Sequence, residues 1–188
     1  MALLDQSIID QLKQYFNSMP EAITISAFLD ESDKSIELDS FLQEIDSVSN
    51  KVNYVKNKFG DNKSLEIELG IIRPISFTLL KDSNKTGISF YGIPGGHEFN
   101  TFILAILGLV GIGKKIDDDK LSKIASINKD LNVETFIALS CTHCPEVVQA
   151  LNLIAINNKN VKSSMVDSGV FFDEAKAKDI QAVPCIYI

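Results

Sequence analysis

Cysteine is scarce in this sequence of 188 residues, which has only three. Small secreted scaffolds that depend on disulfides need many more, so the sequence excludes that class of protein. The chain also opens without a charged segment followed by a short apolar one, the pattern of a secretory signal. From these two absences we expect a protein of the reducing cytoplasm.

Long hydrophobic runs and an excess of positive charge are missing as well. The most apolar stretch covers only residues 102–113 and is interrupted by glycines, whereas a membrane-spanning helix needs about 20 apolar residues. The 18 Lys and Arg residues against 25 Asp and Glu residues give a net charge of −7. This charge repels phosphate backbones and anionic lipid surfaces, so we expect neither nucleic acid nor a membrane as a partner.

What is present is the composition of a folded globular chain, with 45% hydrophobic and 23% charged residues. The spacing of apolar residues predicts alternating helices and strands in the first part of the chain. Helices are expected over residues 5–17, 38–48 and 99–110, and strands over 22–29, 52–55, 75–80 and 86–91. Residues 82–85 are expected to join the last two strands as a hairpin, and 57–73 are ambiguous.

After a charged joint at residues 114–119, the same order of elements begins again. The pattern predicts a helix from Leu121 to Leu131, a strand over 133–139, a helix over 147–155 and a strand over 161–166. Aligning Ala27 with Ala138 also aligns Leu42 with Leu153. We therefore predict an internal duplication.

The duplication predicts an α/β fold of two units, residues 1–116 and residues 117–188. The second unit stops at residues 184–188, inside its third strand, so a strand and a helix of the first unit have no counterpart. An apolar strand at the end of the chain would leave an open sheet edge. We expect that the natural protein continues, or that this piece has been trimmed.

The sequence SCTHCP at residues 140–145 lies where a predicted strand passes into a helix. Unpaired N–H groups and the helix macrodipole stabilise an anion there, so the Cys141 thiolate should form readily. Cys144, three residues further, is within reach for a disulfide and would be the resolving thiol. His143 favours thiolate and should make the pair more oxidising, while Pro145 suits the first turn of a helix.

A Cys-x-x-Cys motif is also half of a common zinc site, which needs two more ligands. Only Cys185, His97 and His143 could supply them, and the chain has no second Cys-x-x-Cys. We therefore favour a redox dithiol and predict no metal. Cys185 itself is expected to be a small hydrophobic residue of the interior, with a third, modulating thiol as the alternative.

Val183-Pro184 opens the strand that should pack beside the dithiol. A cis proline there would present its backbone to a substrate peptide in a mixed disulfide, whereas a trans proline would simply begin a strand. Pro74 takes the equivalent place in the first unit, and Asp30 and Asp33 stand where the second unit has cysteines. The first unit therefore keeps the scaffold without the thiols, as a docking or support module.

Glu98 follows a Gly-Gly-His sequence at the start of a predicted helix. An acid there is ordinarily a favourable first-turn charge, and a functional role is the alternative. The acidic residues 117–119 are expected to be a solvated helix start.

Three segments together resemble the N-terminal domain of the F subunit of alkyl hydroperoxide reductase. They are residues 92–99 (GIPGGHEF), 134–152 (ETFIALSCTHCPEVVQALN) and 182–184 (AVP). The resemblance covers nearly the whole chain and is most specific over 134–152. It implies two tandem thioredoxin-like folds around a central mixed sheet flanked by helices, with the second fold incomplete at its C-terminal end.

In that family the N-terminal domain is tethered to a thioredoxin-reductase-like body that binds FAD and NADH. The resemblance implies a disulfide oxidoreductase that relays electrons from this flavin body to the disulfide of a peroxiredoxin, in peroxide detoxification. Cys141 would attack, Cys144 would resolve, Pro184 would lie beside them, and Glu98 would assist proton transfer. No cofactor is expected in this fragment. The sequence departs from the family in having Cys185 after the proline and in lacking the flavin body.

Two other functions remain open. One is a free-standing tandem thioredoxin-fold protein disulfide oxidoreductase, although such proteins usually carry cysteine pairs in both halves. The other is a non-enzymatic scaffold whose dithiol is structural.

Overall fold

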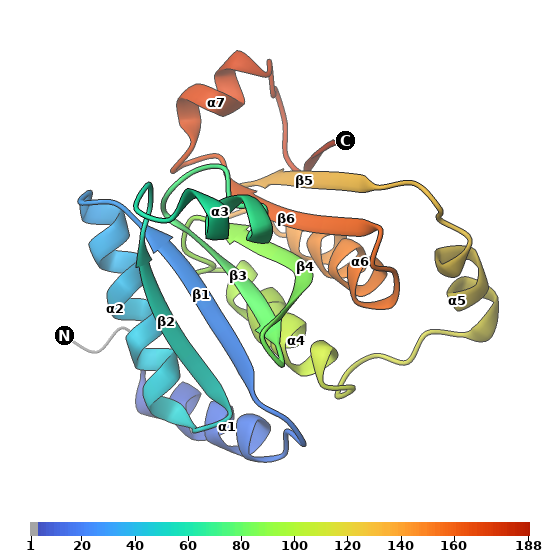
Figure 1. Cartoon of the computed structure of the whole chain (residues 1–188), viewed down its shortest axis with the longest axis horizontal. Coiled ribbons are helices and arrows are strands. Elements are labelled where there is room, and N and C mark those ends of the chain that lie inside the picture. Colours follow the sequence, from blue (N-terminus) through green and yellow to red (C-terminus); the bar gives the residue numbers. More distant parts are fainter. Residues whose placement is uncertain (1–3) are drawn as a thin grey trace.

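The computed structural model describes residues 4–188. Seven strands form one central sheet, with α2, α4 and α6 behind it and α3 in front (Figure 1). The elements run in the order α1 (Gln6–Asn17), β1 (Ile23–Leu29), α2 (Asp33–Val48), β2 (Val52–Lys58), α3 (Lys63–Leu69), β3 (Ser76–Lys81), β4 (Asn84–Tyr91), α4 (Glu98–Leu109), α5 (Asp118–Ala125), β5 (Leu131–Ile137), α6 (Cys144–Asn157), β6 (Val161–Asp167), α7 (Phe172–Ala177) and β7 (Cys185–Tyr187).

The sheet is mixed, and its strand order is β2-β1-β3-β4-β6-β5-β7. β1 pairs in parallel with β2 and antiparallel with β3, and β5 pairs in parallel with β6 and antiparallel with β7. The arrangement β2-β1-β3 therefore reappears as β6-β5-β7, which confirms the repeat. β4 and β6 pair in parallel between the two repeats, so the sheet is continuous across them.

Each repeat contains a short helix that the sequence pattern did not reveal. α3 lies in the segment that was ambiguous, and α7 is its counterpart in the second repeat. Both helices end in a Schellman motif, in which a left-handed residue follows the helix. Gly70 takes this position after α3 and Asp179 after α7, with φ of 74° and 52°. Helices this short carry too little periodic signal to be recognised from apolar spacing alone.

Apolar periodicity explains how the larger elements pack. Leu38, Leu42 and Ile45 form the buried stripe of α2. Ser32 precedes this helix as its N-cap. In the core, the Phe102 ring of α4 contacts three other aromatic rings, those of Phe41, Phe77 and Phe90. This cluster packs α4 against α2 and against the sheet.

Several predicted boundaries differ from the structure. Leu131 begins β5 and does not belong to the preceding helix, which ends at Ala125. β2 extends to Lys58, three residues beyond the predicted strand. The β3–β4 turn consists of Asp82 and Ser83, both with positive φ, so β4 begins at Asn84. A turn this tight pairs two more residues than the predicted loop allowed.

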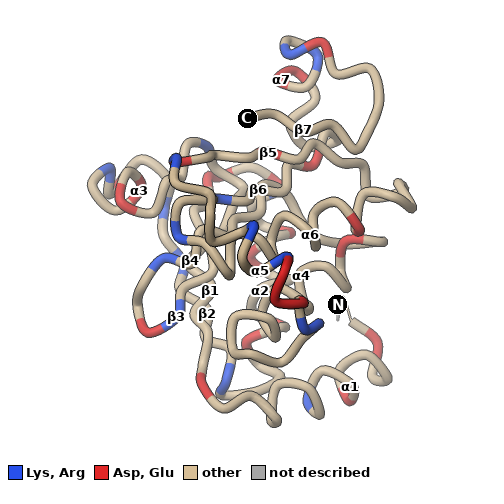
Figure 2. The backbone as a smooth tube through the Cα atoms, turned by 90° about the vertical axis from the view of Figure 1, so that its right-hand side faces the viewer, with Lys and Arg blue, Asp and Glu red and all other residues tan. Residues whose placement is uncertain are grey.

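Charged residues of both signs are dispersed over the chain, and a continuous acidic stretch marks the start of α5 (Figure 2). Asp117 is exposed and caps that helix by accepting a hydrogen bond from the Lys120 N–H, as expected of a solvated helix start. Within residues 4–188, no helix is long and apolar enough to cross a membrane.

Candidate active site

The two cysteines of the motif lie in the turn between β5 and α6, at the C-terminal end of a parallel strand. Cys141 is half-buried in the turn, and its N–H donates to the Ala138 carbonyl at 2.9 Å. Cys144 is fully buried and is the first residue of α6. The two residues form a disulfide, with Cα atoms 5.5 Å apart.

The N-terminus of α6 faces the sulfur atom of Cys141. The Cys144 N–H points to the Cys141 Sγ at 3.1 Å. A backbone donor aimed at this atom, together with the positive end of the helix, favours negative charge on the sulfur once the disulfide is reduced. Pro145 occupies the first turn of α6, as predicted. His143 is the N-cap residue and is exposed, but its side chain makes no capping hydrogen bond.

The segment before β7 lies against the dithiol. The Val183–Pro184 peptide bond is cis, and the Val183 carbonyl oxygen lies 3.9 Å from the Cys141 Sγ. Cys185 follows, half-buried, and packs against the cluster that contains Tyr91 and Phe136. Cys185 thus packs against apolar side chains on one side but is only partly buried, not fully interior as the sequence predicted.

Glu98 is the first residue of α4, and its side chain is completely buried. Neither carboxylate oxygen makes a hydrogen bond of normal geometry with the described residues. Burial raises the pKa of Glu98, and the nearby Thr101 hydroxyl and His97 offset this only in part. Glu98 is therefore not a solvated first-turn charge, and its surroundings disfavour the ionised carboxylate.

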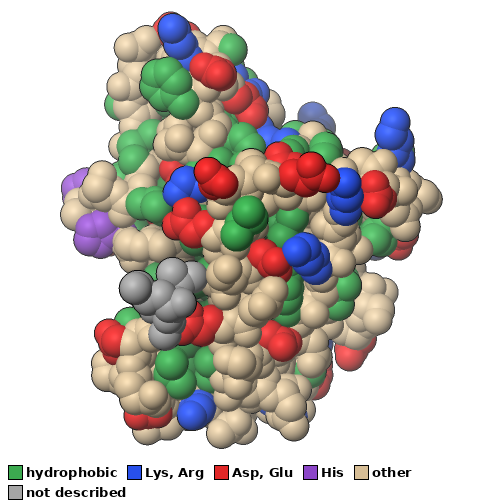
Figure 3. Space-filling model, turned by 90° about the vertical axis from the view of Figure 1, so that its left-hand side faces the viewer, with side chains coloured by type: hydrophobic (Ala, Val, Ile, Leu, Met, Phe, Trp, Pro, Cys, Tyr) green, Lys and Arg blue, Asp and Glu red, His purple; other side chains and the backbone are tan. Residues whose placement is uncertain are grey.

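Two contacts connect the start of α4 with the dithiol turn. The His97 N–H donates to the Leu139 carbonyl at 3.3 Å, two residues before Cys141. The backbone of Gly96 also lies close to this turn, because a Cβ atom at Gly96 would be only 2.7 Å from the Leu139 carbonyl oxygen. The two histidines of the chain gather at one edge of the molecule (Figure 3).

The equivalent turn of the first repeat contains a capping network where the second has thiols. α2 begins at Asp33 as α6 begins at Cys144. Asp30 accepts hydrogen bonds from the Ser32 N–H at 3.0 Å and the Ser35 hydroxyl at 2.7 Å.

In residues 4–188, no three His, Cys, Asp or Glu side chains converge as a set of metal ligands.

Sequence reasoning gave a cis Val183–Pro184 bond with its backbone beside the dithiol as one alternative, and the structure has that bond and the Val183 contact. It did not identify two other features around the dithiol. The Gly96 approach involves backbone atoms, which leave no signal in a single sequence. The second is a cavity of about 630 Å³ between α7 and residues 179–183. It was missed because α7 itself was not predicted.

A cysteine pair at the strand-to-helix turn of a thioredoxin-like repeat, beside a cis-proline segment, defines the class of thioredoxin-like disulfide oxidoreductases. No family model matches the chain. Among proteins of known sequence, the F subunit of alkyl hydroperoxide reductase from Pseudomonas aeruginosa is 37% identical over 186 residues, which cover 99% of this chain and 34% of that protein. A Bacillus subtilis protein named NADH dehydrogenase is 32% identical over 186 residues, which again cover 99% of this chain and 34% of that protein. The chain thus spans about a third of the length of the curated relatives it matches.

Solved structures agree. The NTD_N/C domain of the Enterococcus faecalis alkylhydroperoxide reductase is 35% identical, with a TM-score of 0.90 over 98% of this chain and 89% of that one. The chain therefore belongs to the family of the alkyl hydroperoxide reductase F subunit and corresponds to its N-terminal domain. A protein disulfide oxidoreductase from Aeropyrum pernix is 18% identical, with a TM-score of 0.86 over 100% of this chain and 84% of that one, and so shares the fold.

Proposed function

We propose that this chain is the dithiol electron carrier of a cytoplasmic peroxiredoxin reductase, and that it transfers two electrons from a flavin domain to the disulfide of a peroxiredoxin. The observation that carries the proposal is the position of Cys141, half-buried at the N-terminus of α6 with the Cys144 N–H on its sulfur. The names of the relatives support the peroxide-related role. FAD and NADH would act in the flavin domain and not within these 188 residues.

The proposed transfer has two steps. The Cys141 thiolate attacks one sulfur of the partner disulfide, so that a mixed disulfide forms and one partner thiolate leaves. The Cys144 thiol then loses its proton and attacks the Cys141 sulfur, which releases the second partner thiolate. The partner gains two electrons, and its two thiolates take up two protons, equivalent to the one that Cys141 released to solvent on forming its thiolate and the one that Cys144 loses; this chain ends with the Cys141–Cys144 disulfide.

Glu98 is proposed to hold the proton that Cys144 must lose. Burial raises its pKa and so favours the protonated carboxyl group over the carboxylate, as a group that takes up a proton requires. Its position at the start of α4 places it beside the Leu139 turn that leads into the dithiol. Val183 and Pro184 are proposed to pair with the partner backbone, and His143 to favour the Cys141 thiolate.

Thiol labelling and substitution test the dithiol. After reduction, Cys141 should be alkylated by iodoacetamide at pH 7 before Cys185, and the chain should reduce 5,5′-dithiobis(2-nitrobenzoate). Cys144→Ser should accumulate a stable adduct on Cys141, Cys141→Ser should lose the reaction, and the control Cys185→Ser should keep it. Failure of Cys141 to react, or stoichiometric zinc in the purified protein, would contradict the redox role and favour a structural dithiol.

Partner choice needs a second measurement. The reduced chain is mixed with an oxidised peroxiredoxin, and the thiols that appear on the peroxiredoxin are counted by mass spectrometry. Transfer within seconds to minutes is expected. Reduction of the small disulfide without any transfer to the peroxiredoxin would instead indicate a general protein disulfide oxidoreductase.

A further inference from the structure

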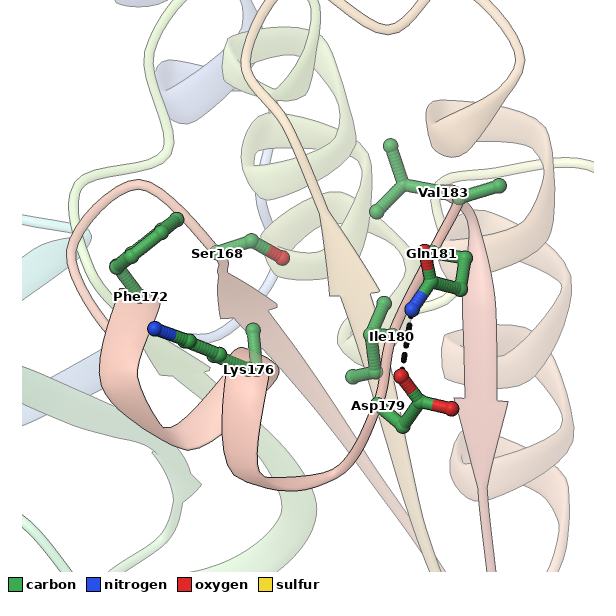
Figure 4. A pocket seen from close by; sticks show the side chains of 9 residues that line it. Ser168, Phe172, Lys176, Asp179, Ile180, Gln181 and Val183 are labelled. Carbon is green, nitrogen blue, oxygen red and sulfur yellow. Dashed lines mark hydrogen bonds between the residues drawn. The ribbon is translucent and has the colours of Figure 1, made fainter.

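A cavity of about 630 Å³ lies on the far side of Val183 from α6, between α7 and the segment that leads to Pro184. Figure 4 shows Phe172 and Lys176 on one wall, Ile180 and Val183 on the other, and Ser168 between them. Cavities of this size accommodate small ligands or side chains.

The cavity adjoins the reacting sulfur through a shared residue. Val183 lines it, and the carbonyl oxygen of the same residue lies 3.9 Å from the Cys141 Sγ. Ser168 follows β6, and its N–H donates to the Ile137 carbonyl at the end of β5 at 2.9 Å. The cavity and the dithiol therefore share the C-terminal edge of the parallel strands, where ligands of open α/β sheets bind.

The lining combines apolar side chains, those of Phe172, Ala175, Ile180, Ala182 and Val183, with the polar residues Ser168, Lys176, Asp179 and Gln181. Phe172 is 64% exposed, so its ring offers apolar surface to a ligand at one wall. The opposite wall is fixed by the Schellman motif of α7, in which the Ile180 N–H donates to the Ala175 carbonyl at 3.0 Å. The Ser168 Oγ is buried without a hydrogen-bond partner among the described residues. Lys176 stands on the rim and makes no ion pair within residues 4–188.

The first repeat has a large side chain at the position of Ser168. Phe59 is the counterpart of Ser168, because its N–H donates to the Leu29 carbonyl at the end of β1 just as Ser168 does at the end of β5. Phe59 packs against a cluster formed by Phe28, Leu69 and Ile71, of which Ile71 is the counterpart of Ile180. An aromatic side chain therefore stands in the first repeat where the second repeat has the small Ser168.

We infer that the cavity receives a large apolar side chain of the partner peptide, next to the cysteine that Cys141 attacks. This inference rests on the proposed transfer of electrons to a protein disulfide and specifies the substrate. The side chain would take the place that Phe59 takes in the first repeat, in contact with Phe172 and Ile180.

Two synthetic peptide disulfides test the inference. Both have the same sequence, except that Phe flanks the cysteine on each side in one and Gly in the other. The second-order rate constant of each is measured with the reduced chain and divided by that for 5,5′-dithiobis(2-nitrobenzoate). The Phe peptide should react about tenfold faster than the Gly peptide, the usual size of an apolar side-chain preference.

Two substitutions should remove this preference by different routes. Ser168→Phe introduces a phenyl ring at the position that Phe59 has in the first repeat, and Phe172→Ala removes one wall, so both should bring the ratio of the peptide rates close to one. Ile67→Ala is the matched control, because Ile67 lies on α3 and is 80% exposed; it should keep the tenfold preference.

The outcomes separate the two proposals. Equal rates for both peptides with the parent chain, or a preference that survives in both Ser168→Phe and Phe172→Ala, would overturn the inference while the redox role stands. A parent chain that reduces none of the three disulfides would contradict the proposed function itself, and the inference with it.

Discussion

Arg73 and Glu174 form an ion pair that joins the loop before β3 in the first repeat to α7 in the second. The Arg73 side chain, 11% exposed, also pairs with Glu134 of β5, and its guanidinium carbon lies 4.3 Å from the centre of the Tyr91 ring. The Lys178 Nζ lies 3.8 Å from the Oε2 of the same Glu134. One arginine thus connects three elements behind the cavity wall.

Replacing Arg73 with methionine should destabilise the fold. The change leaves two half-buried carboxylates with only Lys178 for compensation, and removing one partner of a buried pair is costly. Because Glu174 is partly exposed, we expect the free energy of unfolding in urea to fall by about 2 kcal/mol rather than more. The control Lys58→Met breaks an exposed pair with Glu31 and should leave the free energy of unfolding nearly unchanged. Equal effects of the two substitutions would contradict the importance of the buried pair.

Glu98→Gln should change how stability depends on pH. Burial raises the pKa of Glu98 above its ordinary value of 4.5, so its stabilising contribution is complete below that pH and is lost as the pH rises through the raised pKa. The variant has no charge to bury. Relative to the parent it should gain stability as the pH rises above 4.5, by on the order of 1 kcal/mol, and the gain should level off once the pH has passed the raised pKa.

Urea unfolding at a series of pH values measures this difference. The control Glu68→Gln replaces an exposed carboxylate at the end of α3 and should follow the parent at every pH. Parallel curves for Glu98→Gln and the parent would show that Glu98 is not held in a charge-disfavouring site.

Gly96→Ala should disturb the turn that leads to Cys141. Gly96 has φ of 53°, and its new Cβ would meet the Leu139 carbonyl oxygen at 2.7 Å. We expect a loss of about 2 kcal/mol from the left-handed backbone and the contact together. The neighbouring Gly95→Ala, which places its Cβ in open space, is the control and should change stability by less than about 0.5 kcal/mol. Thermal unfolding of the two variants compares them directly.

Phe102→Ala should be the most destabilising of these substitutions. The ring is fully buried and contacts Phe41, Phe77 and Phe90, so its removal leaves a cavity that rigid neighbours close poorly. A loss of about 3 to 5 kcal/mol, measured by urea unfolding, is typical of such sites. Leu104→Ala on the same helix, at 38% exposure, should cost far less. A small effect at Phe102 would indicate that the aromatic cluster repacks.

The fold was largely predictable because its signals are periodic. The buried stripe of α2 and the apolar strand β1 are plain in the sequence, and the duplication lets one repeat check the other. The helices α3 and α7 were not predictable in the same way, because seven and six residues give too few apolar positions for a period to show. Leu131 was assigned to a helix because an isolated leucine fits either period.

The candidate site likewise contains residues that the sequence identifies and features that only the folded structure shows. Cys141 and Cys144 are identified by residue type and spacing, whereas a role for Glu98 is implied only by the resemblance to the F subunit. Whether Glu98 is buried, however, depends on how α4 packs, and the Val183 contact depends on a backbone atom. Such features arise only when distant segments meet, so no local pattern records them.

The parallel pairing of β4 with β6 makes the boundary between the repeats a ladder of hydrogen bonds. Two modules joined by a hinge could be separated, exchanged or lost one at a time during evolution. Here, separating the repeats would leave the backbone N–H and C=O groups of β4 and β6 without their partners along this edge. The thiol-free repeat is therefore bound to the repeat with the dithiol by backbone pairing, whatever side chains stand in its own strand-to-helix turn.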